Sequence, residues 1–164
     1  LTDMSRLLCQ LSYTAKIADG TIPTGVFYVN IYRMIHTTEL KVRTYECDSN
    51  RHVNNSVYLQ YLEYARTEFL YDIGFDYDTM KSEGYAIFVT NINISYRAPA
   101  KWGDKLLIHS RPVKKRATSG VFSQEIVHEN GTVVSDAEVS WVFVNSDGRP
   151  VKLPEKYNRE ELQP

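Results

Sequence analysis

The clearest pattern in the sequence is a series of hydrophobic positions at helical spacing that stops at a glycine. These positions are Tyr58, Leu62, Ala65, Phe69 and Ile73. The spacing predicts a helix over residues 59–73 with one apolar face, and Gly74 is suited to end it. Just before this helix stand three residues of types that cap helix N-termini well, namely Asn54, Asn55 and Ser56.

Alternating apolar and polar positions predict strands on both sides of this helix. Before it, the alternation runs through residues 37–46. After it, residues 75–84 are polar and turn-like, with a short helix near Tyr77 and Met80. Four further strands are predicted over residues 86–97, 105–114, 121–128 and 132–145. The first of these four alternates so that Phe88, Thr90, Ile92, Ile94 and Tyr96 share one face. Asn130–Gly131 is a strong hairpin signal between the last two.

The order of these elements indicates a fold class. One strand, one long central helix and then an antiparallel meander of four strands are segregated along the chain rather than alternating. This order predicts an α+β fold with an antiparallel sheet. A single sheet can wrap around one helix and bury its apolar face. Because such a layout leaves one sheet face and one edge uncovered, we expect association into dimers.

Composition and charge narrow the function classes. The chain of 164 residues is long enough for one domain with a sizeable core. Its formal net charge of −1 gives no general attraction to nucleic acid or to anionic membranes. No apolar run approaches the roughly 20 residues of a membrane span. Cys9 and Cys47 are far apart and form no metal or redox spacing, which favours a reduced, cytoplasmic protein.

The first 36 residues are harder to interpret, and we treat them as an N-terminal extension ahead of a domain over residues 37–164. A short helix is possible where Leu7, Leu8, Leu11, Ala15 and Ala18 share one face, and residues 26–35 suit a strand or a packed arm. The segment lacks the features of a secretory signal. It is either an extension without a specific role or a segment that covers a sheet edge or a neighbouring subunit.

The loop before the long helix holds the side chains best suited to chemistry. It contains Asp48, His52, Asn54 and Asn55, which are one carboxylate, one imidazole and two carboxamides. The start of a helix offers unpaired backbone N–H groups and a partial positive charge. A carboxylate just upstream of such a start is well placed for acyl chemistry.

The loop and helix also resemble a known signature. Residues 48–55 (DSNRHVNN), with Tyr58, Leu59, Tyr61, Glu63, Ala65 and Arg66, resemble the motif of hotdog-fold thioesterases of the 4-hydroxybenzoyl-CoA thioesterase type. The form is most similar to long-chain acyl-CoA thioesterases, and its His-Val-Asn-Asn part also resembles plant and bacterial acyl-ACP thioesterases. A second block, residues 90–100 followed by Gly103, Asp104 and Leu106, is similar to the strand–turn–strand of this family.

This resemblance covers about residues 38–145, and it implies a fold, an assembly and a catalytic residue. It implies a hotdog fold, in which an antiparallel sheet wraps around one long helix. It also implies homodimers whose sheets join edge to edge, often paired into homotetramers, with active sites at the dimer interface. Asp48 matches the catalytic aspartate of the family. Many members have glycine where Arg51 stands, and some have histidine at the position of Asn55.

The reaction implied is hydrolysis of an acyl thioester to a free acid and a thiol. Backbone N–H groups near Val57 and Tyr58 are candidates to polarise the carbonyl. Asp48 is the candidate catalytic residue, as a general base on water or as a nucleophile that forms an anhydride, and the sequence leaves both routes open. The structural alternative is that Asp48 only caps the loop.

Each remaining candidate also has a structural alternative. Asn54 and Asn55 either orient water or cap the helix, and His52 either acts at the substrate or supports the loop. Glu63 either contacts substrate or pairs with Arg66 one helical turn away. Further candidates are Thr90 for positioning water, and Arg97, Lys101, Lys114 and Arg116 as cations for the phosphates of CoA or of a carrier protein.

Two other functions fit the sequence less well. A non-catalytic hotdog module that binds acyl thioesters would need an attached regulatory segment, and residues 1–36 show no DNA-binding helix pair. A hotdog dehydratase would carry a His-Phe-Pro type of motif, which the loop lacks. The sequence therefore predicts an acyl-CoA or acyl-ACP thioesterase that uses no metal or other cofactor. The acyl chain and the carrier stay open.

Overall fold

The computed structural model describes residues 35–164. The predictions for the N-terminal extension, including the short helix and the arm over residues 26–35, lie outside these residues except at Ile35 and at His36, which is the first residue of β1. The helices and strands are β1 (His36–Lys41), α2 (Asn55–Asp72), α3 (Tyr77–Ser82), β2 (Ala86–Tyr96), β3 (Lys105–Lys115), β4 (Ser119–His128) and β5 (Val133–Val144). Short 3₁₀ turns span Thr44–Glu46, Glu155–Tyr157 and Glu160–Leu162.

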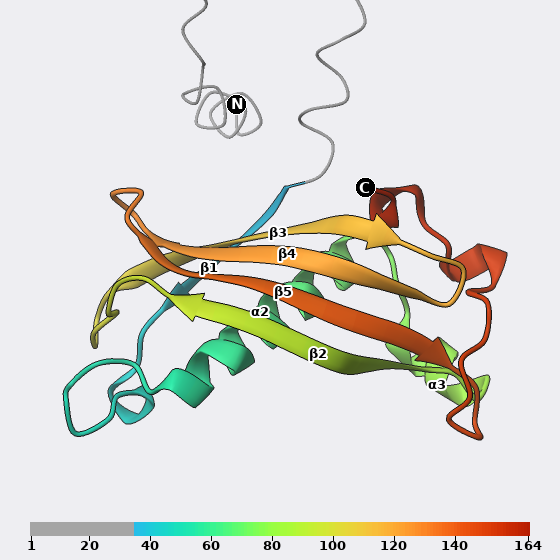
Figure 1. Ribbon diagram of the computed structural model, residues 1–164, viewed down its shortest axis with the longest axis horizontal. Coiled ribbons are helices and arrows are strands. Elements are labelled where there is room, and N and C mark those ends of the chain that lie inside the picture. The colour runs from blue at the N-terminus through green and yellow to red at the C-terminus, as the bar shows by residue number, and fades with distance from the viewer. Residues whose placement is uncertain (1–34) are drawn as a thin grey trace, which may run out of the picture. The chain divides into compact units, whose positions relative to one another are not determined.

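One antiparallel sheet and one long helix form the framework of the structure. The strands lie in the order β1-β3-β4-β5-β2, and every neighbouring pair is antiparallel. Figure 1 shows α2 lying across one face of this sheet, with α3 at the end of α2. This arrangement is the α+β hotdog layout that the sequence predicts. No helix among residues 35–164 has the length and hydropathy needed to cross a bilayer.

The helix α2 forms where its spacing predicts, starting four residues earlier. The Asn54 side chain caps it by accepting a hydrogen bond from Ser56 N at 2.9 Å. At the other end Gly74 takes φ +71°, a left-handed conformation that glycine adopts without steric cost. The buried residues of α2 are Tyr58, Tyr61, Leu62, Ala65, Arg66, Phe69 and Leu70. The predicted apolar face is therefore the face that packs on the sheet.

The predicted meander of four strands is wrong for its first member. β3, β4 and β5 follow one another across the sheet, but β2 pairs with β5 at the far edge. β1 occupies the free edge of β3, from His36 opposite Ser110 to Lys41 opposite Lys105. Because β1 fills that edge, β2 can join the sheet only beside β5.

Two details of the strand prediction also need correction. β1 ends at Lys41 rather than residue 46, because Thr44–Glu46 turns and the Glu46 carboxylate accepts the Arg43 N–H at 2.5 Å. In β2 the pairing with β5 shifts between Val89 and Asn91. A bulge of this kind moves the side chains before it to the opposite faces. Phe88 is consequently 53 % exposed, while Ile87 packs against the core.

The last residues of the chain fold back as a C-terminal strap, defined here as residues 150–164. Its buried side chains are Leu153, Tyr157 and Leu162. Tyr157 lies 5.3 Å from Phe75 and 6.1 Å from Phe143, measured between ring centroids. The Tyr157 hydroxyl donates to Glu83 at 2.7 Å, and Lys156 forms an ion pair with the same carboxylate. The strap is thus fastened to the residue that ends α3.

The Glu83 contacts predict an acid-dependent contribution to stability. Hydrogen bonds first from Lys156 and then from Tyr157 hold the pKa of Glu83 below its ordinary value. A carboxyl whose pKa is lower in the folded state stabilises the fold at neutral pH, and this contribution disappears as the pH falls through the folded pKa. We therefore expect Glu83→Gln to lower Tm at pH 7, with the difference from the parent shrinking toward about pH 3.

Thermal unfolding followed by circular dichroism across this pH range measures the difference. Glu155→Gln, at an exposed position of the same strap, is the matched control and should change Tm little at any pH. A Glu83→Gln deficit that is constant with pH would contradict the expectation.

Candidate active site

The loop between β1 and α2 is held in a fixed conformation by backbone hydrogen bonds. Asp48 N donates to His52 O at 2.9 Å, and Arg51 N donates to Asp48 O at 3.0 Å. At the base of the loop, Val53 N donates to Ala100 O at 2.8 Å. Arg51 takes φ +62°, the left-handed region that favours glycine. This conformation fits the glycine that many members of the resembled family have at the same position.

Only one oxygen of the Asp48 carboxylate forms a hydrogen bond within this loop. Its Oδ1 accepts a hydrogen bond from Asn50 N at 2.8 Å, which closes a tight turn. No donor among residues 35–164 contacts the second oxygen, Oδ2. The capping role and a catalytic role are therefore compatible, because each uses a different oxygen of the carboxylate.

A shallow cleft of about 360 Å³ lies beside Asp48 at the start of α2. The residues that line it are Asp48, His52, Val53, Asn55, Tyr58, Tyr96, Arg97, Ala98 and Pro99. His52 and Asn55 have no side-chain hydrogen-bond partner among the described residues. The cleft thus brings together the acid, the imidazole and one carboxamide that the sequence singles out.

The other carboxamide and the predicted backbone donors have defined partners. Asn54 accepts hydrogen bonds from the backbone N and the hydroxyl of Ser56, so its side chain serves as the helix cap. Val57 N donates to Asn54 O at 2.9 Å. Asn55 N is the helix-start amide that has no acceptor among residues 35–164. The free amide at the start of α2 therefore belongs to Asn55 rather than to Val57, and Tyr58 follows one residue after Val57.

Tyr58 contributes to the cleft through its ring and its hydroxyl. The hydroxyl accepts a hydrogen bond from Ala100 N at 3.2 Å, and the ring lies 5.3 Å from that of Tyr96. Burial raises the pKa of Tyr58, so its phenol is protonated at neutral pH. The Tyr96 hydroxyl donates to Asn55 O at 3.0 Å, which ties β2 to the start of α2.

The predicted cations separate into two groups. Arg97 and Lys101 lie at the loop end of the sheet, since Arg97 lines the cleft and Lys101 bridges to His52. Arg97 Nε donates to Asp136 Oδ1 at 2.6 Å, so part of its charge is already paired. Lys114 and Arg116 lie about 30 Å away, at the far end of β3, given about 3.3 Å per strand residue. A single protomer does not bring these two to Asp48.

Thr90 and Glu63 lie outside the cleft. Thr90 is the residue at the β2 bulge, and its hydroxyl donates to Ser140 O at 3.3 Å. Glu63 forms the ion pair with Arg66 that the helical spacing predicts. The Glu63 side chain is 62 % exposed and the Arg66 side chain 8 %. The pair therefore reaches from the surface into the core.

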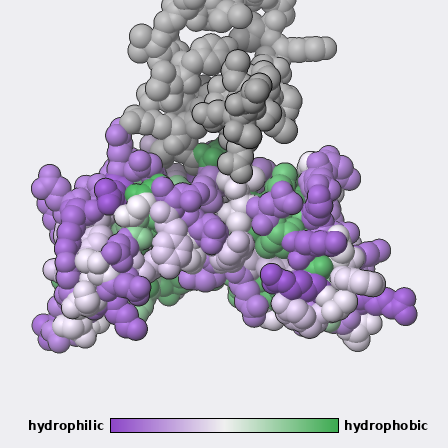
Figure 2. All heavy atoms as spheres, turned by 180° about the vertical axis from the view of Figure 1, so that it is seen from behind, coloured by the Kyte–Doolittle hydropathy of each residue, from purple (hydrophilic) through white to green (hydrophobic). Residues whose placement is uncertain are grey.

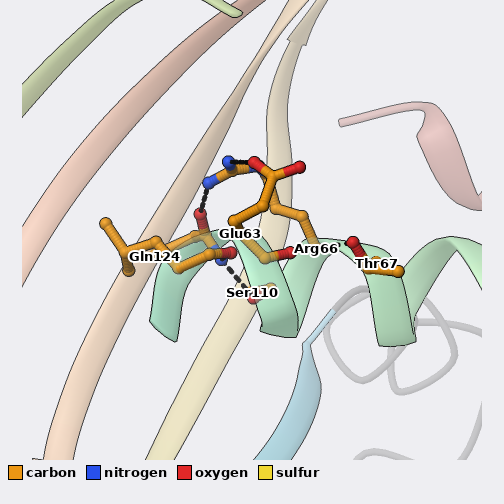
Figure 3. A network of polar contacts seen from close by, with 6 residues as sticks. Glu63, Arg66, Thr67, Ser110 and Gln124 are labelled. Atoms are coloured by element: carbon orange, nitrogen blue, oxygen red, sulfur yellow. Dashed lines mark hydrogen bonds and ion pairs between the residues drawn. The ribbon is translucent and has the colours of Figure 1, made fainter. Parts of the chain in front are cut away.

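Figure 3 shows how the buried end of Arg66 is satisfied. Arg66 Nη1 donates to Gln124 Oε1 at 2.7 Å. Gln124 Nε2 in turn donates to Ser110 Oγ at 2.8 Å and to Leu62 O at 3.0 Å. Burial lowers the pKa of Arg66, and the negative charge of Glu63 opposes that shift. This network connects α2 with β3 and β4.

Sequence reasoning missed two features of the site. One is the wall formed by Tyr96, Ala98 and Pro99, which the sequence marks only as part of the second family-like block, residues 90–100, and not as site residues. The other is Glu46, which is buried beneath the loop. Its carboxylate accepts hydrogen bonds from the Tyr61 hydroxyl at 2.8 Å and from Arg43 N, and its carbonyl accepts Asn54 N at 2.9 Å. Glu46 thus anchors both ends of the loop between β1 and α2.

Comparison with known proteins identifies the class. A family profile described as the thioesterase-like superfamily matches residues 42–160. This range contains the loop, α2 and every strand of the sheet except β1. The chain belongs to the thioesterase-like superfamily and is a thioesterase with a hotdog fold.

Individual relatives agree with this class. The chain is 38 % identical over 127 residues to the long-chain acyl-CoA thioesterase FadM of Escherichia coli, covering 77 % of this chain and 96 % of FadM. It is 30 % identical over 121 residues to the acyl-acyl carrier protein thioesterase ATL3 of Arabidopsis thaliana, covering 73 % and 63 %. The crystal structure of YbaW, a probable thioesterase from Escherichia coli, superposes with a TM-score of 0.67 at 38 % identity, covering 77 % and 95 %.

The Glu46 anchor gives a testable expectation about the loop. Tyr61→Phe removes the hydroxyl that donates to the buried carboxylate, and we expect a loss of about 1–3 kcal/mol in the free energy of unfolding. Tyr64→Phe on the same helix is the matched control, because the Tyr64 side chain is exposed. Urea denaturation measures both variants. Equal stability of the two variants would show that Glu46 does not depend on Tyr61.

Proposed function

We propose that this protein hydrolyses acyl thioesters, releasing a free acid and a thiol, with Asp48 as the catalytic residue. One observation carries the proposal: Asp48, whose Oδ2 accepts no hydrogen bond within residues 35–164, and Asn55, whose backbone N–H has no acceptor there, line the same cleft at the start of α2. A carboxylate can deliver water as a general base or attack the carbonyl carbon itself. Both routes remain part of the proposal.

The start of α2 supplies the hydrogen-bond donor that polarises the substrate carbonyl. The developing oxyanion needs a donor that is already in place before the reaction begins. Asn55 N has no acceptor in the described structure, and it lies at the positive end of the helix dipole. We assign the carbonyl-polarising role to Asn55 N, together with its free carboxamide.

The substrate class follows from the relatives and from the charges near the cleft. FadM is named for acyl-CoA and ATL3 for an acyl carrier protein, and both carriers present the acyl group on a phosphopantetheine arm. Lys101 is exposed at the loop end of the sheet and is the cation best placed to meet a phosphate. Arg97 is the second candidate, although it shares its charge with Asp136.

Substitution of Asp48 tests the assignment. Asp48→Asn keeps the shape of the side chain and the hydrogen bond to Asn50, but it removes the base or nucleophile. We expect kcat for long-chain acyl-CoA hydrolysis to fall about 10²-fold or more. Thiol release coupled to a chromogenic disulfide measures the rate. Asp78→Asn, an exposed carboxylate of α3, should leave kcat unchanged. Parent-like activity of Asp48→Asn would overturn the assignment of Asp48. A parent that hydrolyses no acyl thioester would instead favour a non-catalytic binding module.

We further propose that the active unit is a homodimer joined along β2, which can pair into a tetramer. β2 is 11 residues long, and its outer edge has no partner strand among residues 35–164. A long unpaired edge is a template for another strand. Phe88 and Val89 leave 53 % and 43 % of their surface exposed on this strand. Pairing of two β2 strands would satisfy the hydrogen bonds of this edge and bring Phe88 and Val89 close to the seam.

A charged β2 tests the dimer. We expect the parent to sediment as a dimer or tetramer and the double variant Phe88→Lys/Val89→Lys to sediment as a monomer with unchanged far-ultraviolet circular dichroism, because like charges would face each other across the edge. Val113→Lys, at an exposed hydrophobic position of β3, is the control and should keep the parent's assembly. A monomeric parent would exclude an interface at β2.

A further inference from the structure

A second hollow lies away from Asp48, between the C-terminal half of α2, the inner face of the sheet and the C-terminal strap. Its volume is about 300 Å³. This value is at the lower end of the range for ligand pockets, which is about 300–1,000 Å³. Phe122, Trp141 and Leu70 are among the hydrophobic residues that line it, and two strap residues, Leu153 and Leu162, complete the wall.

The polar groups of this cavity lie on one side. Glu63 and Arg66 line the cavity and also line a shallow groove that runs along α2 toward Leu59 and, across from it, Ile92 of β2. The groove and the cavity therefore adjoin each other at Glu63 and Arg66. Figure 2, viewed from the side on which α2 lies, shows hydrophobic side chains (green) in recesses between polar ones (purple). A ligand in this passage would meet apolar walls beyond a charged entrance.

The passage leads away from the catalytic loop. Asn55, at the start of α2, lines the Asp48 cleft, while Leu70, near its end, lines the cavity. At 1.5 Å per residue these two positions are about 22 Å apart along the helix axis. Figure 1 shows the strap at the end of the sheet opposite the loop. This separation suits a long, flexible, apolar chain whose thioester end lies at Asp48.

A glycine on β4 leaves room for Trp141, one of the residues of the cavity wall. Gly120 of β4 faces Trp141, and a Cβ at Gly120 would lie 2.5 Å from the indole ring and 2.7 Å from Lys114 O. The indole can therefore lie flat over the glycine as part of the cavity wall. The far wall is the strap, which is fixed by Arg159 Nη2 donating to Gly74 O at 3.0 Å and by the contacts of Glu83.

We propose that this cavity receives the distal end of an unbranched acyl chain and that Leu153 and Leu162 of the strap set the longest chain that fits. The inference rests on the proposed thioesterase function and adds the substrate's acyl class and two specificity-determining residues. Burying each additional methylene of the chain gains about 0.8 kcal/mol until the chain meets the strap. Beyond that length, further methylenes must stay in the groove or displace the strap.

Acyl-length profiles test the proposal. The kcat/KM of the parent is measured for straight-chain saturated acyl-CoAs from butanoyl to stearoyl. Leu162→Ala deepens the cavity, and we expect kcat/KM for the chain two carbons beyond the parent's optimum to rise about 10-fold relative to the optimum. Leu162→Phe fills the cavity without leaving a void and should shift the optimum to a shorter chain. This second variant keeps the test intact if Leu162→Ala does not fold.

Leu106→Ala is the matched control, because Leu106 is fully buried on β3 but does not line the cavity. It should lose stability without a change in the length optimum. A parent that hydrolyses none of the acyl-CoAs would refute the proposed function itself. An active parent whose optimum stays fixed in both Leu162 variants, or moves equally in Leu106→Ala, would overturn only the role of the strap.

Discussion

The burial of one face of α2 against the inner face of the sheet determines where the candidate site and the C-terminal strap lie within residues 35–164. Four of the five hydrophobic residues that predict this helix are buried in the structure, and each large one contributes about 1.5–3 kcal/mol when fully removed from water. Because a single helix occupies the concave face, its two ends lie at opposite ends of the sheet. The N-terminus meets the Asp48 loop, and the C-terminus meets the strap.

The same interface contains a charge, and this restricts how the helix can sit. Arg66 points into the core, where an unpaired guanidinium would cost several kcal/mol. Gln124 and Glu63 satisfy it, and Gln124 is itself held by Ser110 and by the carbonyl of Leu62. A shift of α2 by one turn would leave these groups without partners. We infer that hydrophobic burial drives the packing, while the network selects one register and thereby fixes where the helix begins.

The parts of the site that could be predicted from the sequence are those determined by nearby residues. The Asp48 turn, the Asn54 cap and the Glu63–Arg66 pair each join residues at most four positions apart, so the motif itself contains them. The bulge in β2, the crossing of β2 to β5 and the Glu46 anchor depend on what lies across the sheet or beneath the loop. Alternation along one strand cannot reveal such partners, so the sequence predicts the wrong face for Phe88 and gives no signal for Glu46.

The residues proposed for catalysis depend on local contacts, whereas the residues proposed for acyl-chain selectivity depend on contacts between distant parts of the chain. The groups assigned to catalysis lie within residues 48–55, and their geometry depends on hydrogen bonds inside that segment and on Glu46. The cavity wall combines Leu70 with Leu153 and Leu162, which are more than 80 residues further along the chain. Substitutions in the strap can therefore alter which acyl chains fit without disturbing the loop. On this basis, relatives that share the loop signature need not share a substrate, and the acyl chain must be inferred from the cavity rather than from the motif.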